Sequence, residues 1–228
     1  MKQSLKWLFL FLFFAAAGDG WGEAQEGGSI RLSSPAYDGK ISVERAIKER
    51  RTTRAFRPQP LTMGQLSQLF WSAQGITDET RGFRSAPSGG ALYPLDVYAV
   101  VGDGGVVGLE SGVYHYQPES HSIKFIRKGD RRTEVAGASL WQMWMAKAPV
   151  MFIVTSEHKR ITCKYGNRGI RYAQIEAGHV GQNIFLQSRA LGLAAGIVGA
   201  FQDGAVAEAI GAPKAHRPLI IMPVGYGK

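Results

Sequence analysis

The chain has 228 residues and a formal net charge of +9; 45% of its residues are hydrophobic, 20% are charged and one is cysteine. This composition excludes a wholly disordered or collagen-like protein, and the length is enough for one domain with a large core. A single cysteine excludes an intramolecular disulfide and a thiolate zinc site, so any redox chemistry must come from a cofactor.

Residues 1–24 are predicted to be a signal peptide. Lys2 and Lys6 precede an apolar run of eleven residues, 7–17, and small residues and glycines follow that run. The run is shorter than the ~20 residues that a membrane-spanning helix needs. No cysteine lies directly after this run, and no twin arginine precedes it. The sequence therefore predicts an exported protein, periplasmic or secreted, that touches a membrane only through this transient segment.

Residues 25–41 are rich in Gly, Ser and Pro and are predicted to be a linker before a single domain, residues 42–228. Ser42 is a candidate N-cap for a first helix, and Thr62 with Gln65 has the spacing of a capping box for a second. The first half of the domain is thus expected to contain two helices, a strand, a hairpin and a further helix, over residues 42–51, 62–75, 95–101, 112–127 and 130–147.

The second half of the domain begins with the apolar run 150–155, which predicts a central strand. Residues 170–191 predict a long helix with two apolar stripes, so little of it would face water and it would lie in a core or a subunit interface. A last helix and a last strand are expected over 202–210 and 218–225. Because strands and helices interleave without strict βαβ repetition, we expect an α+β layer fold.

Three short segments have residue types that suit a bound cofactor. RRTTRAF, residues 50–56, offers forked donors and hydroxyls that suit a phosphate. SAPSGGALYP, residues 85–94, has a bare backbone that a flat group could approach closely. GIVGAF, residues 196–201, is a second stretch of small residues, which a tight turn would explain equally well. The glycines at 102–105 do not have the dinucleotide-binding spacing and are expected to form a turn.

The basic residues are partly clustered, with six between Arg45 and Arg57 and five between Lys159 and Arg171. Charge alone leaves nucleic acid, a phosphate-bearing cofactor and an anionic membrane open as partners. A solvated surface explains the second cluster equally well, because its spacing has no order. The five histidines lack metal-ligand spacing and are expected to have hydrogen-bonded or surface roles.

Together these segments resemble the nitroreductase superfamily of FMN-dependent oxidoreductases, and within it the branch of the azoline dehydrogenases of thiazole/oxazole-modified peptide synthesis. RRTTRAF is similar to the family's R-R-S-x-R opening, and SAPSGGALYPLDVYAV to the branch's S-x-P-S-G-G-A-L-Y-P segment. LWQMWMAKAPV resembles the middle flavin-contact helix, and GLAAGIVGAF with LIIMPVGYGK resembles the C-terminal glycine-rich turn and last strand. The similarity runs from about residue 42 to residue 228.

The resemblance implies a set of FMN-binding residues. Four would hold the phosphate and ribityl chain: Arg50, Arg51, Thr52 and Arg54. Four would contact the same flavin from the partner subunit of a homodimer: Pro87, Ser88, Gly89 and Gly90. Gln142 would hydrogen-bond the flavin's polar edge. Three would line the isoalloxazine, where a backbone N–H can stabilise developing charge: Val198, Gly199 and Ala200.

The resemblance also implies a nitroreductase-like layer fold, with a mostly antiparallel central sheet flanked by helices and residues 170–191 as the buried helix of the dimer core. Family members often end in an arginine-containing tail, whereas this chain leaves only Lys228 to contact the phosphate. The further catalytic residues of the peptide-modifying members are not located in the sequence. Tyr93 and Tyr114 are candidate proton donors.

We therefore expect a homodimeric enzyme that moves a hydride between bound FMN and a small organic substrate, with no nucleic acid as partner. Two alternatives remain: a non-enzymatic basic module that binds an anionic polymer or lipid, and a flavin-binding protein without turnover. The basic module explains the charge but not the glycines at 88–90 and 196–199. Because nicotinamide nucleotides are cytosolic, an exported enzyme is expected not to use free NAD(P)H as its physiological donor.

Overall fold

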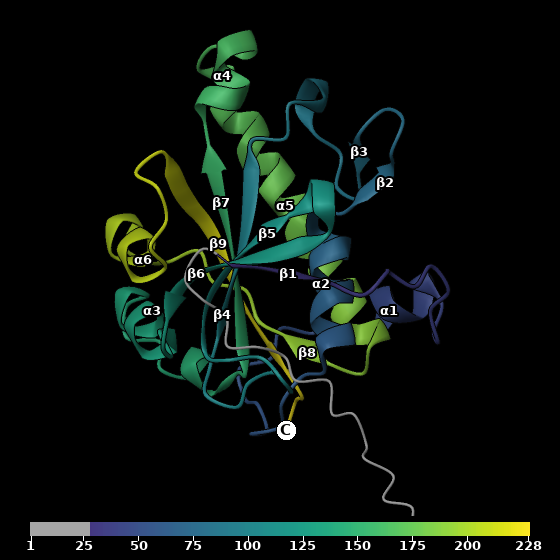
Figure 1. The fold of residues 1–228 in the computed structure, drawn as a ribbon, viewed down its shortest axis with the longest axis vertical. Helices are drawn as coiled ribbons and strands as arrows, with labels where there is room; N and C mark the ends of the chain where they lie inside the picture. The colour runs from purple at the N-terminus through teal and green to yellow at the C-terminus, as the bar shows by residue number, and fades with distance from the viewer. Residues whose placement is uncertain (1–27) are drawn as a thin grey trace, which may run out of the picture.

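The computed structural model describes residues 28–228, so the predicted signal peptide lies outside the described residues. A seven-stranded sheet forms the middle of the molecule, in the order β1-β6-β5-β4-β7-β9-β8, and neighbouring strands are antiparallel (Figure 1). Its strands are β1 Ser29–Arg31, β4 Leu95–Val101, β5 Gly112–Gln117, β6 Ser122–Lys128, β7 Val150–Glu157, β8 Ala194–Ala195 and β9 His216–Gly225. The expected α+β fold with an antiparallel central sheet is confirmed.

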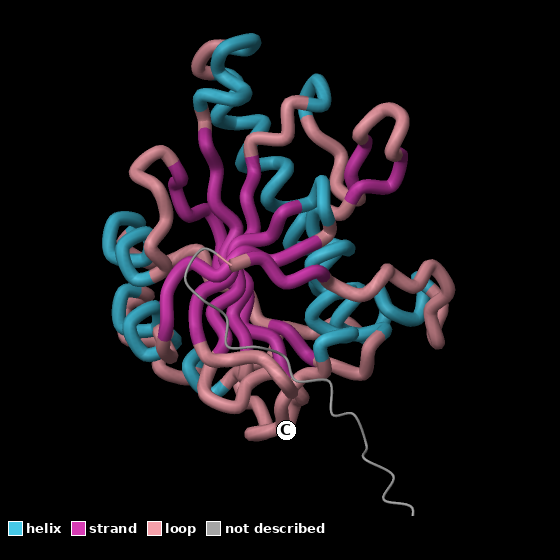
Figure 2. Tube along the Cα trace, in the orientation of Figure 1, coloured by secondary structure: helices cyan, strands magenta, loops and turns pink. Residues whose placement is uncertain are grey.

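Helices cover both faces of this sheet (Figure 2). On one face lie α1 Val43–Glu49, α2 Met63–Gln74, α4 Lys159–Tyr165 and α5 Arg168–Ala190, and on the other lie α3 Arg132–Ala138 and α6 Asp203–Ala209. Short elements complete the fold: the β2–β3 hairpin, Ile76–Asp78 and Phe83–Arg84, and the 3₁₀ turns η1 Gly89–Ala91, η2 Pro118–Ser120 and η3 Met145–Lys147. None of the helices between residues 28 and 228 is both long and apolar enough to span a bilayer.

Strands β4 and β7 contribute side chains to two hydrophobic cores, one on each face of the sheet. Successive side chains of a strand point to opposite faces, so Val97 and Ala99 of β4 join the core under α2 and α5, whereas Tyr98 and Val100 join the core under α3 and α6. Both faces are covered, which is why β4 and β7 read as continuous apolar runs rather than alternating ones. The sheet is therefore a rigid platform, and its ends position the segments that carry the sequence motifs.

Local signals placed the first two helices correctly. The Ser42 side chain accepts a hydrogen bond from the Arg45 N–H at 3.2 Å. Thr62 and Gln65 form the predicted capping box, with the Gln65 N–H donating to Thr62 Oγ1 at 3.1 Å and the Thr62 N–H donating to Gln65 Oε1 at 2.9 Å. These caps satisfy backbone donors that the first turn of a helix leaves without partners.

Three elements differ from the sequence expectations. Strand β1 lies within the predicted linker 25–41 and pairs with β6 at the sheet edge. The predicted helix over 130–147 is wrong: α3 ends at Ala138, and Leu140 and Trp141 have φ values of 54° and 58°, which a right-handed helix does not allow. The basic cluster between Lys159 and Arg171, which showed no order in the sequence, forms α4 and the start of α5.

Candidate functional site

The RRTTRAF segment is fixed against two distant parts of the chain by backbone hydrogen bonds. The Thr53 N–H donates to the Ala195 carbonyl at 2.9 Å, beside β8. The Lys228 N–H donates to the Ala55 carbonyl at 3.2 Å. Because these bonds join the motif to β8 and to the C-terminus, residues 50–56, 194–200 and 226–228 form one end of the molecule. We call it the arginine end; in Figure 1 it lies at the foot of the molecule, where the C-terminus is marked.

The arginines at this end are held without carboxylates. The Arg54 guanidinium lies 5.8 Å from the Trp144 ring centroid, and the Arg50 guanidinium lies 5.1 Å from that of Phe185. Arg51 Nη1 donates to the Lys48 and Arg50 carbonyls at 3.0 and 2.7 Å. Within residues 28–228 none of the three forms an ion pair with an acid. Their charges therefore remain available to an anion.

The glycine-rich turn adds backbone donors at the same end. Val198 is buried and exchanges two backbone hydrogen bonds with Ile221, each 2.9 Å. Gly199 and Ala200 are exposed, and across the described chain their N–H groups donate to no protein acceptor. Gln142 Nε2 donates to the Ala200 carbonyl at 3.5 Å. The structure thus brings Gln142 beside residues 198–200, with two backbone donors left for a ligand.

Aromatic residues that the sequence reasoning missed line this end. The rings of Phe56 and Trp144 are stacked, with centroids 6.5 Å apart. A Cβ at Gly196 would lie 2.9 Å from Trp144 Cη2 and 2.8 Å from the Thr53 carbonyl oxygen, so only glycine lets the turn pass so close. Trp144 belongs to LWQMWMAKAPV, for which the sequence predicts a helix, and no local pattern indicates that it packs against the arginine motif.

The Pro87–Gly90 loop lies at the opposite end of the molecule, which we call the loop end. A Cβ at Gly90, whose φ is 66°, would lie 2.6 Å from Tyr165 Oη and 3.2 Å from Lys164 Nζ. Gly89 faces Tyr172, near the start of α5, whereas Arg50 packs on Phe185, thirteen residues further along the helix. At about 1.5 Å per residue that is about 20 Å. One chain therefore does not bring the loop to the arginine end.

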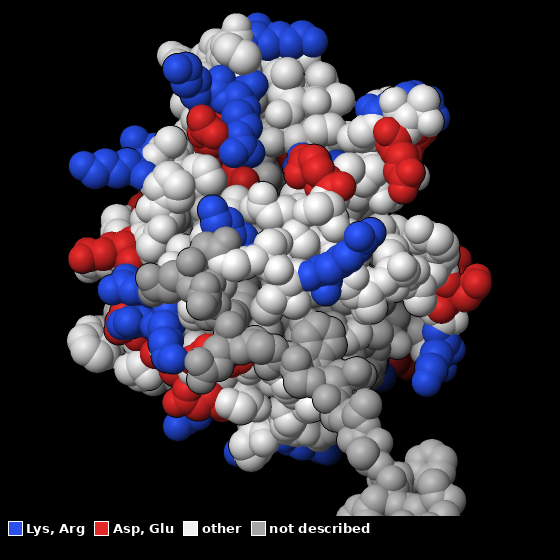
Figure 3. Space-filling model, viewed as in Figure 1, with Lys and Arg blue, Asp and Glu red and all other residues white. Residues whose placement is uncertain are grey.

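Helix α4 gives the loop end its basic character. Four basic residues on α4 and the first turn of α5 are exposed and form no ion pair with an acid of residues 28–228: Lys159, Lys164, Arg168 and Arg171. Lys and Arg side chains gather over α4 in Figure 3. Lys164 Nζ lies 5.4 Å from the Tyr165 ring centroid. Lys164 and Tyr165 are thus titratable groups beside the loop, and sequence reasoning missed them because α4 carries no clear apolar period.

The two candidate tyrosines have different surroundings. Tyr114 is buried in the core and its hydroxyl donates to the Glu110 carbonyl at 2.7 Å, and burial raises its pKa well above the usual value. Tyr114 as a proton donor is therefore wrong, because neither flavin nor substrate can reach it. Tyr93 is half-buried, its hydroxyl accepts from the Arg84 N–H at 3.2 Å, and the Arg84 guanidinium lies 4.6 Å from its ring centroid.

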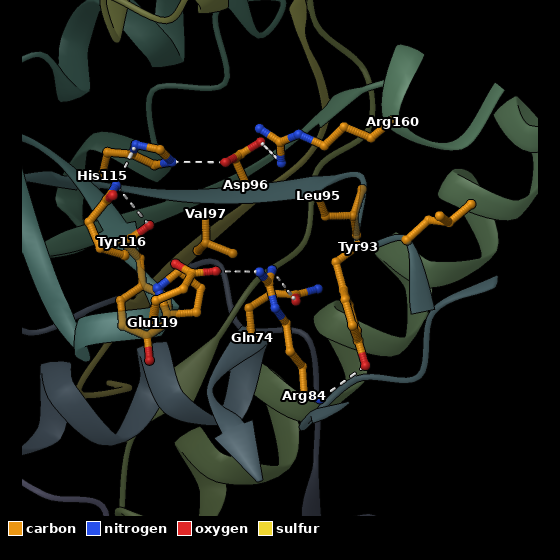
Figure 4. A pocket seen from close by; sticks show the side chains of 13 residues that line it. Gln74, Arg84, Tyr93, Leu95, Asp96, Val97, His115, Tyr116, Glu119 and Arg160 are labelled. Carbon is orange, nitrogen blue, oxygen red and sulfur yellow. Dashed lines mark hydrogen bonds and ion pairs between the residues drawn. The ribbon is translucent and has the colours of Figure 1, made fainter. Parts of the chain in front are cut away.

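A cavity of about 420 Å³ adjoins the loop end, between β4, β5, η2 and α4 (Figure 4). On its wall Asp96 accepts from His115 Nε2 at 3.0 Å and pairs with Arg160 at 2.9 Å. Burial opposes ionisation of Asp96, but His115, Arg160 and His216 together hold its pKa below the usual value. In residues 28–228 no group of three His, Cys, Asp or Glu side chains is arranged to hold a metal ion.

The comparisons with known proteins settle the family. The model of the nitroreductase family matches residues 47–226. This chain belongs to the nitroreductase family. MJ1384 of Methanocaldococcus jannaschii, which is named as a nitroreductase, is 42% identical to this chain over 199 residues. The match covers 87% of this chain and 98% of MJ1384. The trifolitoxin-processing protein TfxB of Rhizobium leguminosarum bv. trifolii is 33% identical over 154 residues, 60% of this chain but 39% of TfxB.

Solved structures agree with this assignment. A nitroreductase-family structure from Ralstonia eutropha superposes with a TM-score of 0.75 at 25% identity, covering 88% of this chain and 90% of that one. A chain of the Escherichia coli microcin synthetase McbBCD complex, solved with truncated pro-MccB17 bound, superposes with a TM-score of 0.70 at 25% identity, covering 85% and 75% of the two chains. The resemblance to the branch that contains peptide-processing members is confirmed.

Proposed function

We propose that this protein is an FMN-dependent oxidoreductase that transfers a hydride between bound flavin and a small organic substrate. Members of its family bind flavin. The observation that carries the proposal is the arginine end, where cations without carboxylate partners lie beside two free backbone N–H groups. That donor set fits a group with a phosphate at one extremity and hydrogen-bond acceptors at the other. When bound, FMN supplies the redox chemistry that no side chain here provides.

The residues of the arginine end have distinct roles in this proposal. Arg50, Arg51, Thr52 and Arg54, with Lys228, hold the phosphate and the ribityl chain, and the pairing of Lys228 with Ala55 keeps the C-terminus beside them. The N–H groups of Gly199 and Ala200 stabilise negative charge on the ring, because they are oriented before the reaction. Gln142 binds the polar edge.

A second copy of the chain completes the site. Only a partner subunit can bring Pro87–Gly90 to the arginine end, because the two lie about 20 Å apart along α5 in one chain. An apolar surface is available for it: Ile175 on α5 is 50% exposed, and Val43 and Ile47 on α1 are 57% and 55% exposed. Two antiparallel copies of α5 would cover this surface and join each loop to the other subunit's arginines.

The loop end then supplies the proton chemistry. Lys164 and Tyr165 lie against Gly90, so in the dimer they border the flavin of the other subunit. Hydride transfer to or from an organic substrate leaves a heteroatom that must gain or lose a proton. The Tyr165 hydroxyl, which lies against Gly90, can supply that proton.

The FMN titration of the purified protein tests the cofactor. We expect a yellow protein, or a colourless one that takes up FMN in preference to FAD, because residues 28–228 contain no pyrophosphate-binding loop. Light scattering should report twice the chain mass. A protein that takes up no FMN would favour a basic anion-binding module, and an FMN-loaded monomer would contradict the shared site.

Export and the electron donor are tested separately. Mass spectrometry of the protein from its native cell should find residues 1–24 removed. Anaerobic stopped-flow measurements should then show slow flavin reduction by NADH and NADPH and faster reduction by another donor. Saturable reduction by either nucleotide, together with an uncut N-terminus, would show that the predicted export of the protein is wrong.

A further inference from the structure

Arg84 of β3 is held in one orientation on the wall of the cavity at the loop end. Its guanidinium lies 4.6 Å from the Tyr93 ring centroid, and its Nη1 donates to Gln74 Oε1 at 3.2 Å. Gln74 is 1% exposed, and its Nε2 in turn donates to the buried Glu176 carboxyl at 3.3 Å. An aromatic ring and a buried amide thus orient the guanidinium before any ligand arrives.

The carboxylate partner of Arg84 is, by contrast, an exposed residue. Arg84 Nη2 pairs with Glu119 Oε1 at 2.9 Å, and the Glu119 side chain is 70% exposed, whereas that of Arg84 is 14% exposed. Figure 4 shows the guanidinium joined to both Gln74 and Glu119. Glu119 belongs to η2, at the tip of the β5–β6 hairpin, and its side chain makes no other bond within the described part of the chain. Exposed ion pairs contribute little net stability, so Glu119 can leave Arg84 at small cost.

Glu119 occupies only part of the donor edge of Arg84. A carboxylate that meets an arginine side-on accepts two parallel hydrogen bonds, one from Nε and one from Nη2. Glu119 accepts from Nη2 alone, and Arg84 Nε donates to no acceptor in residues 28–228 and is not shielded from solvent. The carboxylate of a free ligand, which is not tied to a hairpin, can accept both bonds.

Arg160 and Asp96, which also line the cavity, already neutralise each other. Arg160 pairs with Asp96 at 2.9 Å and with Glu157 at 2.8 Å. Burial opposes the ionisation of Asp96, but hydrogen bonding and nearby cations hold its pKa below the usual value. Once Glu119 moves away, Arg84 is therefore the side chain of this wall whose charge is uncompensated. A single negative charge matches it, whereas the ionised Asp96 repels a second one.

The remaining wall of the cavity suits a small organic molecule. The volume of about 420 Å³ lies in the range of small-molecule sites, and Leu92 and Pro118 add apolar surface beside the polar groups. Ala91 and Tyr93 have φ values of 53° and 44°, in the left-handed region that residues other than glycine adopt only at a cost. Such strain is concentrated at binding sites, and here it belongs to the segment that carries the Tyr93 ring to Arg84.

We propose that this cavity is a binding site for a small organic monocarboxylate, which accepts hydrogen bonds from Nε and Nη2 of Arg84 in place of Glu119. Gln74 and Tyr93 hold the guanidinium, and Glu119 covers it until the ligand arrives. The site is separate from the arginine end, so this inference does not depend on the proposed function. Because Glu119 competes with the ligand, removing its charge should tighten binding, whereas removing a group that contacts the ligand would weaken it.

Calorimetric titration of the full chain, with any flavin that it carries, tests this with butyrate as the probe. Butyrate should bind at least about tenfold more tightly than butyramide, its neutral counterpart of the same shape. E119Q should bind butyrate about three- to fivefold more tightly than the wild type, the worth of an exposed ion pair. E110Q removes the same charge from the pair of Glu110 with Lys128 and should match the wild type. Equal affinities for butyrate and butyramide, or for butyrate in E119Q and wild type, would overturn the proposal.

Heteronuclear NMR locates the bound carboxylate. The Nε–H signal of Arg84 should shift as butyrate is added, and it is identified by its absence from R84K. R84K keeps the charge but loses the fork of donors, so it should weaken butyrate binding by about tenfold or more. If R84K does not fold, the comparison of E119Q with E110Q still decides.

Two outcomes separate this site from the flavin site. An unshifted Arg84 signal with butyrate bound, or a butyrate affinity that falls in proportion to added FMN, would place the ligand elsewhere and overturn the proposal. A protein that binds butyrate as described but takes up no FMN would contradict the proposed function alone.

Discussion

The arginine end and the loop end both contain basic residues and glycines, but the structure arranges them differently. At the arginine end, backbone pairing joins three distant segments, and arginines are held on aromatic rings and carbonyl oxygens with their charge uncompensated. At the loop end, the glycines pack against α4 and the start of α5, and the basic residues lie on the exposed face of α4. The first arrangement suits the holding of a phosphate, and the second suits proton chemistry beside a flat group. In the proposed dimer, each end supplies half of a site.

The largest effect is expected at the loop end, from Y165F. If the Tyr165 hydroxyl supplies a proton in the reaction, its removal should lower turnover by about 100-fold or more with FMN still bound. Y114F is the matched control, since it removes a hydroxyl from the core: it should cost about 1 kcal/mol of stability and leave flavin reoxidation unchanged. Rapid-reaction kinetics with a fixed organic acceptor measure both. Equal turnover in Y165F and wild type would remove Tyr165 from the chemistry.

A substitution at the arginine end should weaken FMN binding rather than lower turnover. R54A should weaken FMN binding by about 1.5–3 kcal/mol, which is about 10- to 150-fold, through loss of a charge-assisted hydrogen bond. R81A is the control, because Arg81 lies in the exposed β2–β3 turn and pairs with Asp78. Fluorescence titration with FMN measures both. If R81A weakens binding as much as R54A, general charge rather than a specific contact holds the cofactor.

The buried acid should make the stability of the FMN-free protein depend on pH. The pKa of Glu176 is raised on folding from 4.5 to about 7, so its neutral form favours the folded state. That contribution is complete below about pH 4.5 and is lost as the pH rises to about 7, with a size of about 1–3 kcal/mol. Denaturant unfolding at several pH values should show this loss in the wild type and not in E176Q. An identical loss in both would assign it to other groups.

The smallest effect is expected from mixing two damaged variants in one dimer. This experiment tests directly whether the arginine end of one subunit and the loop end of the other form one site. R54A damages the arginine end and G90V the loop end, where a side chain would meet Tyr165. A heterodimer of the two has one site with both halves intact and one with both damaged, so it should recover about half of the FMN sites of the wild type. Each variant alone should recover few. Sites that lie within one chain would stay defective in the mixture.

The sequence predicted those parts of the fold whose signals are local. The capping box at Thr62 and the apolar runs of β4 and β7 specify their elements within a few residues. Strand β1 has three residues and no apolar pattern, and it forms because β6 presents an edge to it. The helix expected over 130–147 stops at Ala138, because Leu140 and Trp141 adopt left-handed backbone angles that propensity does not anticipate.

The sequence by itself determined which motifs this protein carries and the family to which they belong, because a motif is a local run of residue types. Only the tertiary structure decided which motifs meet. Thr53 reaches Ala195 and Lys228 reaches Ala55 through pairings more than a hundred residues apart in the chain, and α5 keeps Ser88 away from all of them. In the sequence, nothing distinguishes Glu176 from the other charged residues of α5. Its burial and its hydrogen bond from Gln74 follow from the packing of α2 against α5, which no local pattern encodes.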